Sequence, residues 1–291
     1  MKTEPIVKDM TDTRTSTVGQ LLLDRGKLTL AQAEKALLLQ KEENLRFGEA
    51  AIKLGFITSQ DLQEVLSEQF DYPFLPGDDE SLSPQLIAAY KPQSAQVEAL
   101  RSLRSQLMLR WISLGNKVFS VTSHESNVRC GWLAANLAIV FSQLGERTLL
   151  IDTNLRAPQQ HRLFKLDNRV GLADVLASRA RLDCAQRIGH LLDLSVLTAG
   201  TPVPNPQELL GRAQFGELLE EAAQRYDVVV VGTAPMHNAA DAQIVAARAG
   251  GVLLLAESGK TAMVPLMRCR DELVAAGARI LGCVLDMGEG A

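Results

Sequence analysis

Short apolar runs recur through the last two-thirds of the chain, and segments with helical periodicity separate them. The six runs cover Val118–Thr122, Thr148–Asp152, Leu194–Thr198, Val228–Val231, Val252–Ala256 and Ile280–Leu285. A strand without polar alternation is buried on both faces, and strands that alternate with helices form a parallel sheet covered by helices on each side. The sequence therefore predicts an α/β domain over residues 92–287.

The loop between the first run and the following helix stands where a phosphate-binding loop is expected. That motif, G-x-x-x-x-G-K-[ST], brings backbone N–H groups, a lysine and a hydroxyl to phosphate and magnesium. The remnant of the loop consists here of Ser126, Asn127, Val128, Arg129, Cys130 and Gly131. Cys130 stands in the place of the lysine and Gly131 in that of the hydroxyl. The sequence predicts a P-loop-NTPase-like sheet domain whose loop has lost its ligand side chains.

Charge and hydropathy limit the partners. The net charge of −4 gives no electrostatic case for nucleic acid or for anionic lipid. The chain lacks a signal-peptide core, and no segment approaches the ~18–20 apolar residues of a membrane span. We expect a cytoplasmic protein without direct membrane insertion, which reaches the inner membrane only through a partner. Its four cysteines have no metal-ligand spacing, so no metal site is expected.

The N-terminal third contains an ungapped tandem repeat, residues 17–40 and 46–69. Each copy combines an apolar stripe, a glycine, a threonine typical of a helix N-cap, and a second amphipathic segment. One copy cannot bury its own apolar face, so the two should pack together. We predict a small all-α tandem-repeat domain over residues 15–72 after a disordered segment, 1–14. A linker, 73–91, in which prolines and acidic residues gather, should follow.

The repeat resembles the MshEN form of the N-terminal domain of type II secretion and type IV pilus ATPases, whose two motifs clasp cyclic di-GMP (c-di-GMP). The resemblance implies a c-di-GMP site at Gly19, Leu22, Leu23, Gly26, Gln40, Arg46, Phe47, Gly48, Gly55 and Gln69. The first copy begins at Thr17 rather than at an arginine, and a guanidinium is the natural partner of a phosphate. A helical docking module that binds only protein is the alternative.

Several loops of the second domain occur in the order seen in bacterial tyrosine kinases. These segments are Leu149–Phe164, Gly171–Arg179, Leu194–Gly200, Pro204–Leu210 and Tyr226–Pro235. With the repeat attached, the whole chain resembles the EpsG-type chain-length determinant kinases of exopolysaccharide gene clusters. That resemblance implies an autokinase that phosphorylates tyrosines in its C-terminal tail. It also implies a partner, the membrane chain-length determinant (Wzz-like) protein, with which the kinase controls polymer export.

The acidic groups of that family are only partly present. Asp152 remains at the end of the second strand, whereas Asn154 replaces the next aspartate and Gly232 stands where the third is expected. Phosphoryl transfer depends on positioning and on charge neutralisation by lysine and Mg²⁺. We therefore predict an inactive copy, a pseudokinase with Asp152 as a catalytic remnant, and we expect no bound Mg·ATP. The closing residues, DMGEGA, contain no tyrosine.

Glu98, Arg101 and Arg104 form an E-x-x-R-x-x-R pattern on one face of an expected helix. The resemblance implies that this face is the subunit interface of a ring-shaped oligomer. The alternative is a solvated face with an internal ion pair. We interpret the chain as a degenerate tyrosine-kinase-like regulator or scaffold of exopolysaccharide synthesis, in a homo- or hetero-oligomer with an active kinase paralogue. An active autokinase that uses Arg129 and a non-hydrolysing nucleotide switch remain open as alternatives.

Two further patterns are weaker. Residues 258–261, SGKT, follow a strand in the manner of a P-loop end, but the upstream glycine is missing and a helix N-cap is favoured. His124 and Cys130 suggest a nucleophile pair, yet no orienting third group is evident.

Overall fold

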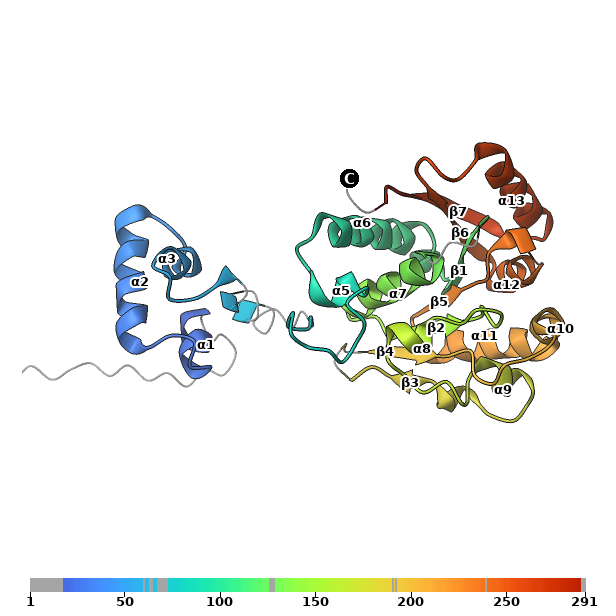
Figure 1. Cartoon of the computed structure of the whole chain (residues 1–291), viewed down its shortest axis with the longest axis horizontal. Helices are drawn as coiled ribbons and strands as arrows, with labels where there is room; N and C mark the ends of the chain where they lie inside the picture. The colour runs from blue at the N-terminus through green and yellow to red at the C-terminus, as the bar shows by residue number, and fades with distance from the viewer. Residues whose placement is uncertain are drawn as a thin grey trace, which may run out of the picture. The chain divides into compact units, whose positions relative to one another are not determined.

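The computed structural model describes residues 18–59, 61–62, 65–66, 73–125, 129–189, 191, 193–238 and 240–288. The chain divides into two compact units, Met1–Pro73 and Phe74–Ala291 (Figure 1). The predicted disordered segment, 1–14, lies outside the described residues. No helix within the described ranges combines the length and the apolar character needed to cross a bilayer.

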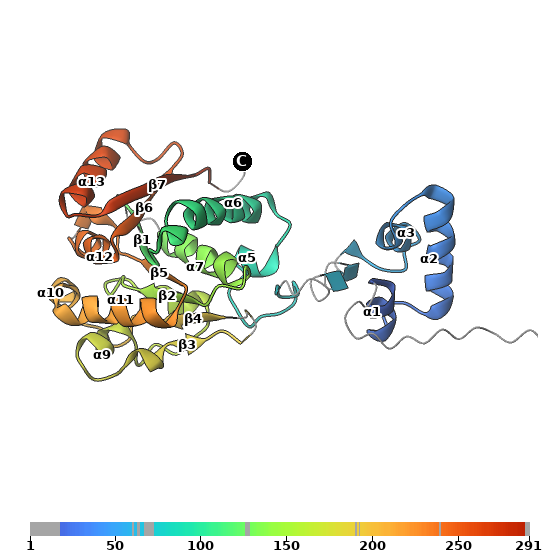
Figure 2. The ribbon, with the colours of Figure 1, turned by 180° about the vertical axis from the view of Figure 1, so that it is seen from behind.

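The described part of the first unit is helical (Figure 2). Its helices are α1 (Val18–Asp24), α2 (Leu30–Glu43) and α3 (Phe47–Lys53). Its core is formed by Leu22, Leu28, Ala36, Ala51, Ile57 and Val65. The same turn occurs twice, because Gly26 and Gly55 take φ values of 68° and 70°. After each glycine a threonine exchanges hydrogen bonds with the residue three positions on, Thr29 with Gln32 and Thr58 with Asp61. The two turns therefore share one local geometry.

The second unit contains a seven-stranded sheet with the order β3-β4-β2-β5-β1-β6-β7. The strands are β1 (Val118–Ser123), β2 (Thr148–Asp152), β3 (Gln186–Arg187), β4 (Leu194–Leu197), β5 (Val228–Gly232), β6 (Gly251–Glu257) and β7 (Arg279–Asp286). All pairings are parallel except that of β3 with β4. The predicted α/β fold class with a parallel sheet is confirmed.

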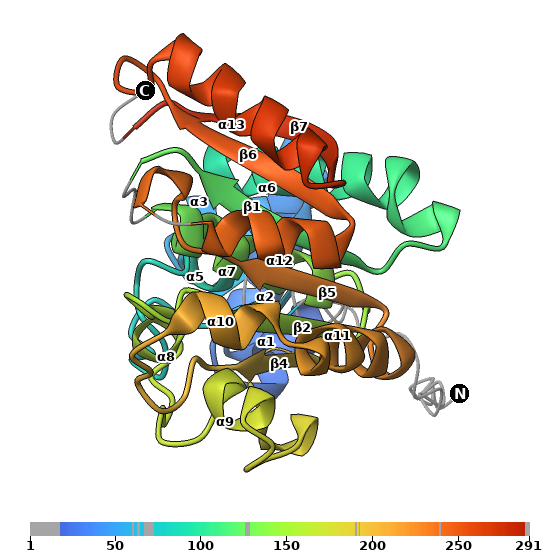
Figure 3. The same ribbon diagram turned by 90° about the vertical axis from the view of Figure 1, so that its right-hand side faces the viewer.

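Helices cover both faces of this sheet. One face packs against α5 (Ile87–Tyr90), α6 (Ala95–Arg110) and α7 (Arg129–Ser142), with α8 (Gln160–Leu163) nearby. The other packs against α9 (Leu172–Leu176), α10 (Pro206–Gly211), α11 (Ala213–Arg225), α12 (Asp241–Ala249) and α13 (Met263–Ala275). Figure 3 shows α12 and α13 in front of the sheet and α5, α6 and α7 behind it. The predicted strands are buried on both faces because each face has its own helical layer.

Two regions differ from the sequence prediction. The segment 73–91, predicted as a linker, packs into the second unit, where Leu75, Leu82 and Leu86 are buried in the core. Asn136 of α7 holds this segment by accepting a hydrogen bond from the Ala88 N–H at 2.9 Å. The prediction followed the prolines and acidic residues, which are typical of loops, and the three leucines are too widely spaced to form a recognisable pattern. Strand β3 was missed because it has only two residues, and both are polar.

Candidate functional site

The candidate site lies where β1, β2 and β5 end at one edge of the sheet. In open parallel sheets, ligands bind outside the carboxyl ends of the strands. A cavity of about 20 Å³ opens here. It is lined by Cys130, Gly131, Asp152, Asn154, Gln159, Gln160, Gly232, Thr233 and Pro235. The structure therefore brings together Cys130, Gly131, Asp152, Asn154 and Gly232 of the predicted site. Arg129 does not line the cavity, and Ser126, Asn127 and Val128 lie outside the described residues.

Asp152 organises the loop after β2. Its carboxylate is buried and accepts hydrogen bonds from the backbone N–H groups of Asn154 at 3.2 Å and of Gln159 and Gln160 at 2.9 Å each. Burial raises the pKa of this carboxyl to about 6, although the three hydrogen bonds favour the ionised form. Asp152 thus has a structural task in addition to any role toward a ligand.

The beginning of α7 carries Cys130 and Gly131, so neither position supplies a lysine or a hydroxyl. Cys130 is buried, and burial raises the pKa of its thiol to about 12, so the side chain is neutral at pH 7. A Cβ atom on Gly131 would lie 2.6 Å from Oε1 of Gln159. Gln160 donates from Nε2 to the Gly131 carbonyl at 3.0 Å. Two side-chain amides therefore occupy the space beside the first turn of α7.

Gln160 Oε1 is buried and has no hydrogen-bond partner among the described residues. Sequence reasoning missed Gln159 and Gln160, although they lie within the loop that carried the family resemblance. It also missed Arg156, which pairs with the buried Asp241 at 2.7 Å and so ties this loop to α12. Asn154 itself caps the loop by accepting a hydrogen bond from the Ala157 N–H at 3.1 Å.

Arg129 carries the cation nearest to the beginning of α7 in sequence, and the structure pairs it with Asp286 at the end of β7. The distance from Arg129 Nη1 to Asp286 Oδ2 is 3.1 Å, and the guanidinium also lies 5.7 Å from the centre of the Trp132 ring. The side chains of Arg129 and Asp286 are largely shielded from solvent, with exposures of 23% and 12%. This ion pair joins the beginning of α7 to the end of β7, the outermost strand of the sheet.

The predicted interface residues lie on α6, and two of them pair with each other. Arg101 Nη1 is 3.0 Å from Glu98 Oε2, as the interpretation with an internal ion pair expects. Arg104 Nη1 donates to the Val140 carbonyl at 2.8 Å. The last four carbonyls of a helix lack intrahelical donors, so Arg104 stabilises the end of α7 within the same unit.

The residues of the predicted c-di-GMP site have mixed environments. Leu22 is buried in the core, Leu23 and Phe47 pack against it, and a Cβ on Gly19 would lie 3.4 Å from the Phe47 ring. Gly48 allows close packing, because its Cβ would lie 2.6 Å from Leu62. Arg46 is exposed before α3. Gly26 and Gly55 form the turns, Gln40 is half-buried on α2, and Gln69 lies outside the described residues.

The weaker patterns have structural explanations. Thr261 accepts a hydrogen bond from the Glu257 N–H and Lys260 pairs with the Glu257 carboxylate, so SGKT forms a turn. Helix α13 begins after it, with Ala262 at the cap. His124 Nδ1 lies 3.2 Å from Sγ of Cys269 rather than beside Cys130. Within the described residues, no group of three or more His, Cys, Asp or Glu side chains is placed to hold a metal ion.

Comparisons with known proteins identify the family to which this chain belongs. The fold and the strand ends define a P-loop-NTPase-like α/β protein. No family model matches the sequence. The chain is 35% identical over 201 residues to the tyrosine-protein kinase YwqD of Bacillus subtilis, covering 69% of this chain and 85% of the relative. It is 32% identical over 206 residues to the putative tyrosine-protein kinase CapB of Staphylococcus aureus, covering 71% and 90%. The chain belongs to the bacterial tyrosine-protein kinase family.

Solved structures agree with this assignment. The kinase domain of the Escherichia coli tyrosine kinase ETK has a TM-score of 0.69 and 32% identity, over 73% of this chain and 84% of that chain. The chimerical protein CapA2B2 has a TM-score of 0.66 and 30% identity, over 77% and 97%. Both similarities are confined to about three quarters of this chain.

The prediction that Mg·ATP is not a ligand is wrong. Relatives named tyrosine-protein kinases show that the chain belongs to a family that transfers phosphoryl groups from a nucleotide. The septum site-determining protein MinD complexed with Mg-ADP, from Pyrococcus horikoshii, has the same fold at a TM-score of 0.51 and 19% identity. The prediction gave too much weight to individual ligand side chains and too little to the family.

Proposed function

We propose that this chain is a catalytically degenerate tyrosine-kinase-family protein that regulates or scaffolds exopolysaccharide synthesis and chain-length control. The observation that carries the proposal is the beginning of α7, where Cys130 and Gly131 replace a lysine and a hydroxyl. The buried thiol is neutral, and the amides of Gln159 and Gln160 fill the adjacent space. Because phosphoryl transfer depends on neutralising the developing charge, this environment supports little transfer.

The proposal is that phosphoryl transfer is weak, while the nucleotide still binds. Magnesium would supply charge neutralisation at the phosphates when bound, and Asp152 is the carboxylate that would hold it. Helix α7 has 14 residues, and its first N–H groups are of the kind that bind phosphate. Arg129, the first residue of α7, would add a guanidinium once it leaves Asp286. These features favour a second candidate function, a nucleotide switch that does not hydrolyse its ligand.

Binding and transfer should be measured separately on the full chain. Fluorescent ATP and ADP analogues with Mg²⁺ report binding, and radiolabelled ATP with a Glu–Tyr copolymer reports phosphoryl transfer. We expect binding with transfer close to background. A repaired variant, Cys130→Lys with Gly131→Ser and Asn154→Asp, should raise transfer at least tenfold. Transfer by the unaltered chain at the rate of an active relative would overturn the proposed degeneracy and favour an active autokinase.

The partners follow from the family resemblance. We propose an oligomer that contains either copies of this chain or an active kinase paralogue, and a contact with a Wzz-like membrane chain-length determinant. Glu98 is the most exposed member of the proposed interface, with 69% of its side chain exposed. Glu98→Lys should lower the mass of the oligomer in light scattering, whereas Glu217→Lys on α11 should not. Equal masses for the unaltered chain and both variants would show that Glu98 of α6 does not lie in the interface.

The first unit is proposed to bind c-di-GMP through its repeated motif. Arg46 is the exposed cation of the second motif and stands where the resemblance places a phosphate partner. Calorimetric titration of the full chain with c-di-GMP should give saturable heat, and Arg46→Ala should weaken binding at least tenfold. Arg25→Ala serves as the matched control, because Arg25 is also exposed but lies at a turn. An absence of heat would contradict c-di-GMP binding and favour the alternative, a helical docking module that binds only protein.

A further inference from the structure

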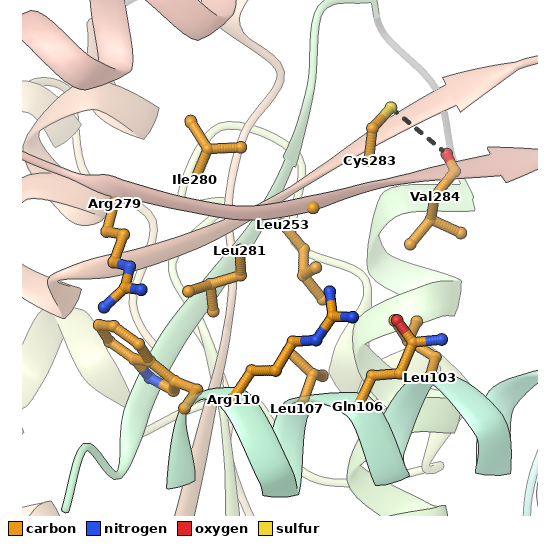
Figure 4. Close-up of a pocket in the computed structure, with 12 residues that line it drawn as sticks. Leu103, Gln106, Leu107, Arg110, Leu253, Arg279, Ile280, Leu281, Cys283 and Val284 are labelled. Carbon is orange, nitrogen blue, oxygen red and sulfur yellow. Dashed lines mark hydrogen bonds between the residues drawn. The ribbon is translucent and has the colours of Figure 1, made fainter. Parts of the chain in front are cut away.

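A second cavity lies away from the strand ends, between α6 and the edge strand β7. Its volume is about 290 Å³, close to the lower limit of small-molecule sites. Helix α6 contributes Leu103, Gln106, Leu107 and Arg110, at the i, i+3, i+4 and i+7 spacing that defines one helix face. Figure 4 shows these side chains rising toward β7. The cavity is therefore built mainly from regular elements, α6, β7 and Leu253 of β6, rather than from loops.

A β-bulge in β7 shapes the opposite wall. Val252 pairs with Ile280 but Leu253 pairs with Gly282, so Leu281 is the extra residue. The bulge keeps Arg279, Leu281 and Val284 directed toward α6, while Ile280 and Cys283 point to the other side (Figure 4). At the floor, a Cβ on Gly282 would meet only a Leu253 methyl, at 3.8 Å. The missing side chain of Gly282 thus leaves open the space that a ligand would fill.

Two guanidinium groups give this cavity its charge. Arg110 and Arg279 are both exposed, and no carboxylate pairs with either of them among the described residues. Arg279 lies 5.9 Å from the centre of the Trp111 ring, which holds it in place by a cation–π contact. In a chain of net charge −4, a cavity lined by two arginines and several leucines is a local concentration of positive charge beside apolar surface. Guanidinium pairs suit carboxylate or phosphate groups.

We propose that the cavity between α6 and β7 binds a small amphiphilic anion, with a carboxylate or phosphate head between Arg110 and Arg279. Its apolar body would lie against Leu107, Leu281 and the floor at Gly282. The volume suits a body about as large as a phenylalkyl group. This inference is independent of the proposed function, because none of these residues lines the cavity at the strand ends.

The two tryptophans allow a test with an internal control. Trp111 lines the cavity, whereas Trp132 lies on α7 beside Arg129. Two-dimensional NMR of the full chain, with the indole signals assigned by Trp132→Phe, should be recorded during titration with 4-phenylbutyrate, phenyl phosphate and the neutral 4-phenylbutyramide. We expect saturable shifts of the Trp111 signal with an anion and at least tenfold weaker binding of the amide. A stronger response to one anion identifies the head group.

Variants complete the test. Arg110→Gln with Arg279→Gln should weaken anion binding at least tenfold, and Gly282→Val should abolish it by filling the floor without backbone strain. Arg187→Gln on β3 is the matched control, and thermal unfolding verifies that each variant is folded. The inference is overturned if neither anion shifts the Trp111 signal, if only Trp132 responds, or if the double arginine variant binds as the unaltered chain does. Equal binding of the amide would also overturn it.

Discussion

The loops that follow β1 and β2 lie at the same edge of the sheet, yet their side chains have different tasks. After β2, Asp152 accepts three backbone hydrogen bonds and Arg156 pairs with Asp241. These side chains determine the course of the loop. After β1, Gly131 has no side chain and the Cys130 thiol is buried and neutral. Of the ligand residues that the family resemblance implies here, Asp152 is the one that also holds its own backbone in place.

This difference bears on the proposed degeneracy of the site. A residue that only contacts a ligand can be replaced at little cost to folding, whereas a residue that satisfies buried backbone groups cannot. The proposed loss of lysine and hydroxyl beside Asp152 would fit relaxed selection on phosphoryl transfer. Each of the following predictions tests whether the two loops really differ in this way.

The largest effect is expected for the Asp152 carboxylate. Asp152→Ala leaves the N–H groups of Asn154, Gln159 and Gln160 without their acceptor, and each unsatisfied buried group costs roughly 1–3 kcal/mol. Asp152→Asn retains one acceptor oxygen. We expect the alanine variant to be less stable than the asparagine variant by about 3 kcal/mol, measured by urea unfolding at pH 7. Equal stabilities would mean that Asp152 does not hold the loop.

Asp152 should also leave a signature in the pH dependence of stability. Its pKa is raised from 3.8 to about 6 in the folded chain, because burial disfavours the charge. The folded state therefore binds the proton more tightly, and the free energy of unfolding should fall as the pH rises from about 4 to about 6. A shift of about two pKa units corresponds to about 3 kcal/mol.

The contribution of Asp152 can be isolated by comparison with Asp152→Asn across that pH range. Asp61, Asp174 and Asp227 have lowered pKa values, so they add stability as the pH rises, but they do so equally in both proteins. A difference between the two proteins that stays constant with pH would contradict the raised pKa.

Continuous apolar runs predicted the parallel strands, because a strand such as Val228–Gly232 is buried throughout. Sequence reasoning could not find the contributions of Gln159, Gln160 and Asp241. Their roles depend on contacts between separate loops, and no local pattern distinguishes a glutamine that fills a site from one in solvent. The buried leucines of residues 75–86 were missed for a related reason, since they pack singly and leave no period.

A moderate effect is expected where α7 meets β7. A double-mutant cycle with Arg129→Met and Asp286→Asn should give a coupling free energy of about 1 kcal/mol that weakens with added salt. The Arg187–Asp193 pair is the matched control, with side-chain exposures of 68% and 48%, and should give less than about 0.5 kcal/mol. Equal coupling in the two pairs would show that Arg129 is no more constrained than a surface arginine.

The smallest effect is expected for Gly131→Ser, which restores a hydroxyl to α7. The new Cβ would meet Oε1 of Gln159 at 2.6 Å, but that atom ends a flexible side chain that can move. Serine also favours a helix over glycine by about 0.5 kcal/mol, so stability should change by less than about 1 kcal/mol.

Gly171→Ala is the contrasting control for Gly131→Ser, because its Cβ would lie 2.2 Å from the Thr198 carbonyl oxygen, a backbone atom that cannot yield in the same way. We expect that variant to lose about 3 kcal/mol or more in the same unfolding assay. If Gly131→Ser lost as much, the beginning of α7 would be as constrained by folding as the loop after β2. Relaxed selection would then no longer explain why its ligand side chains are absent.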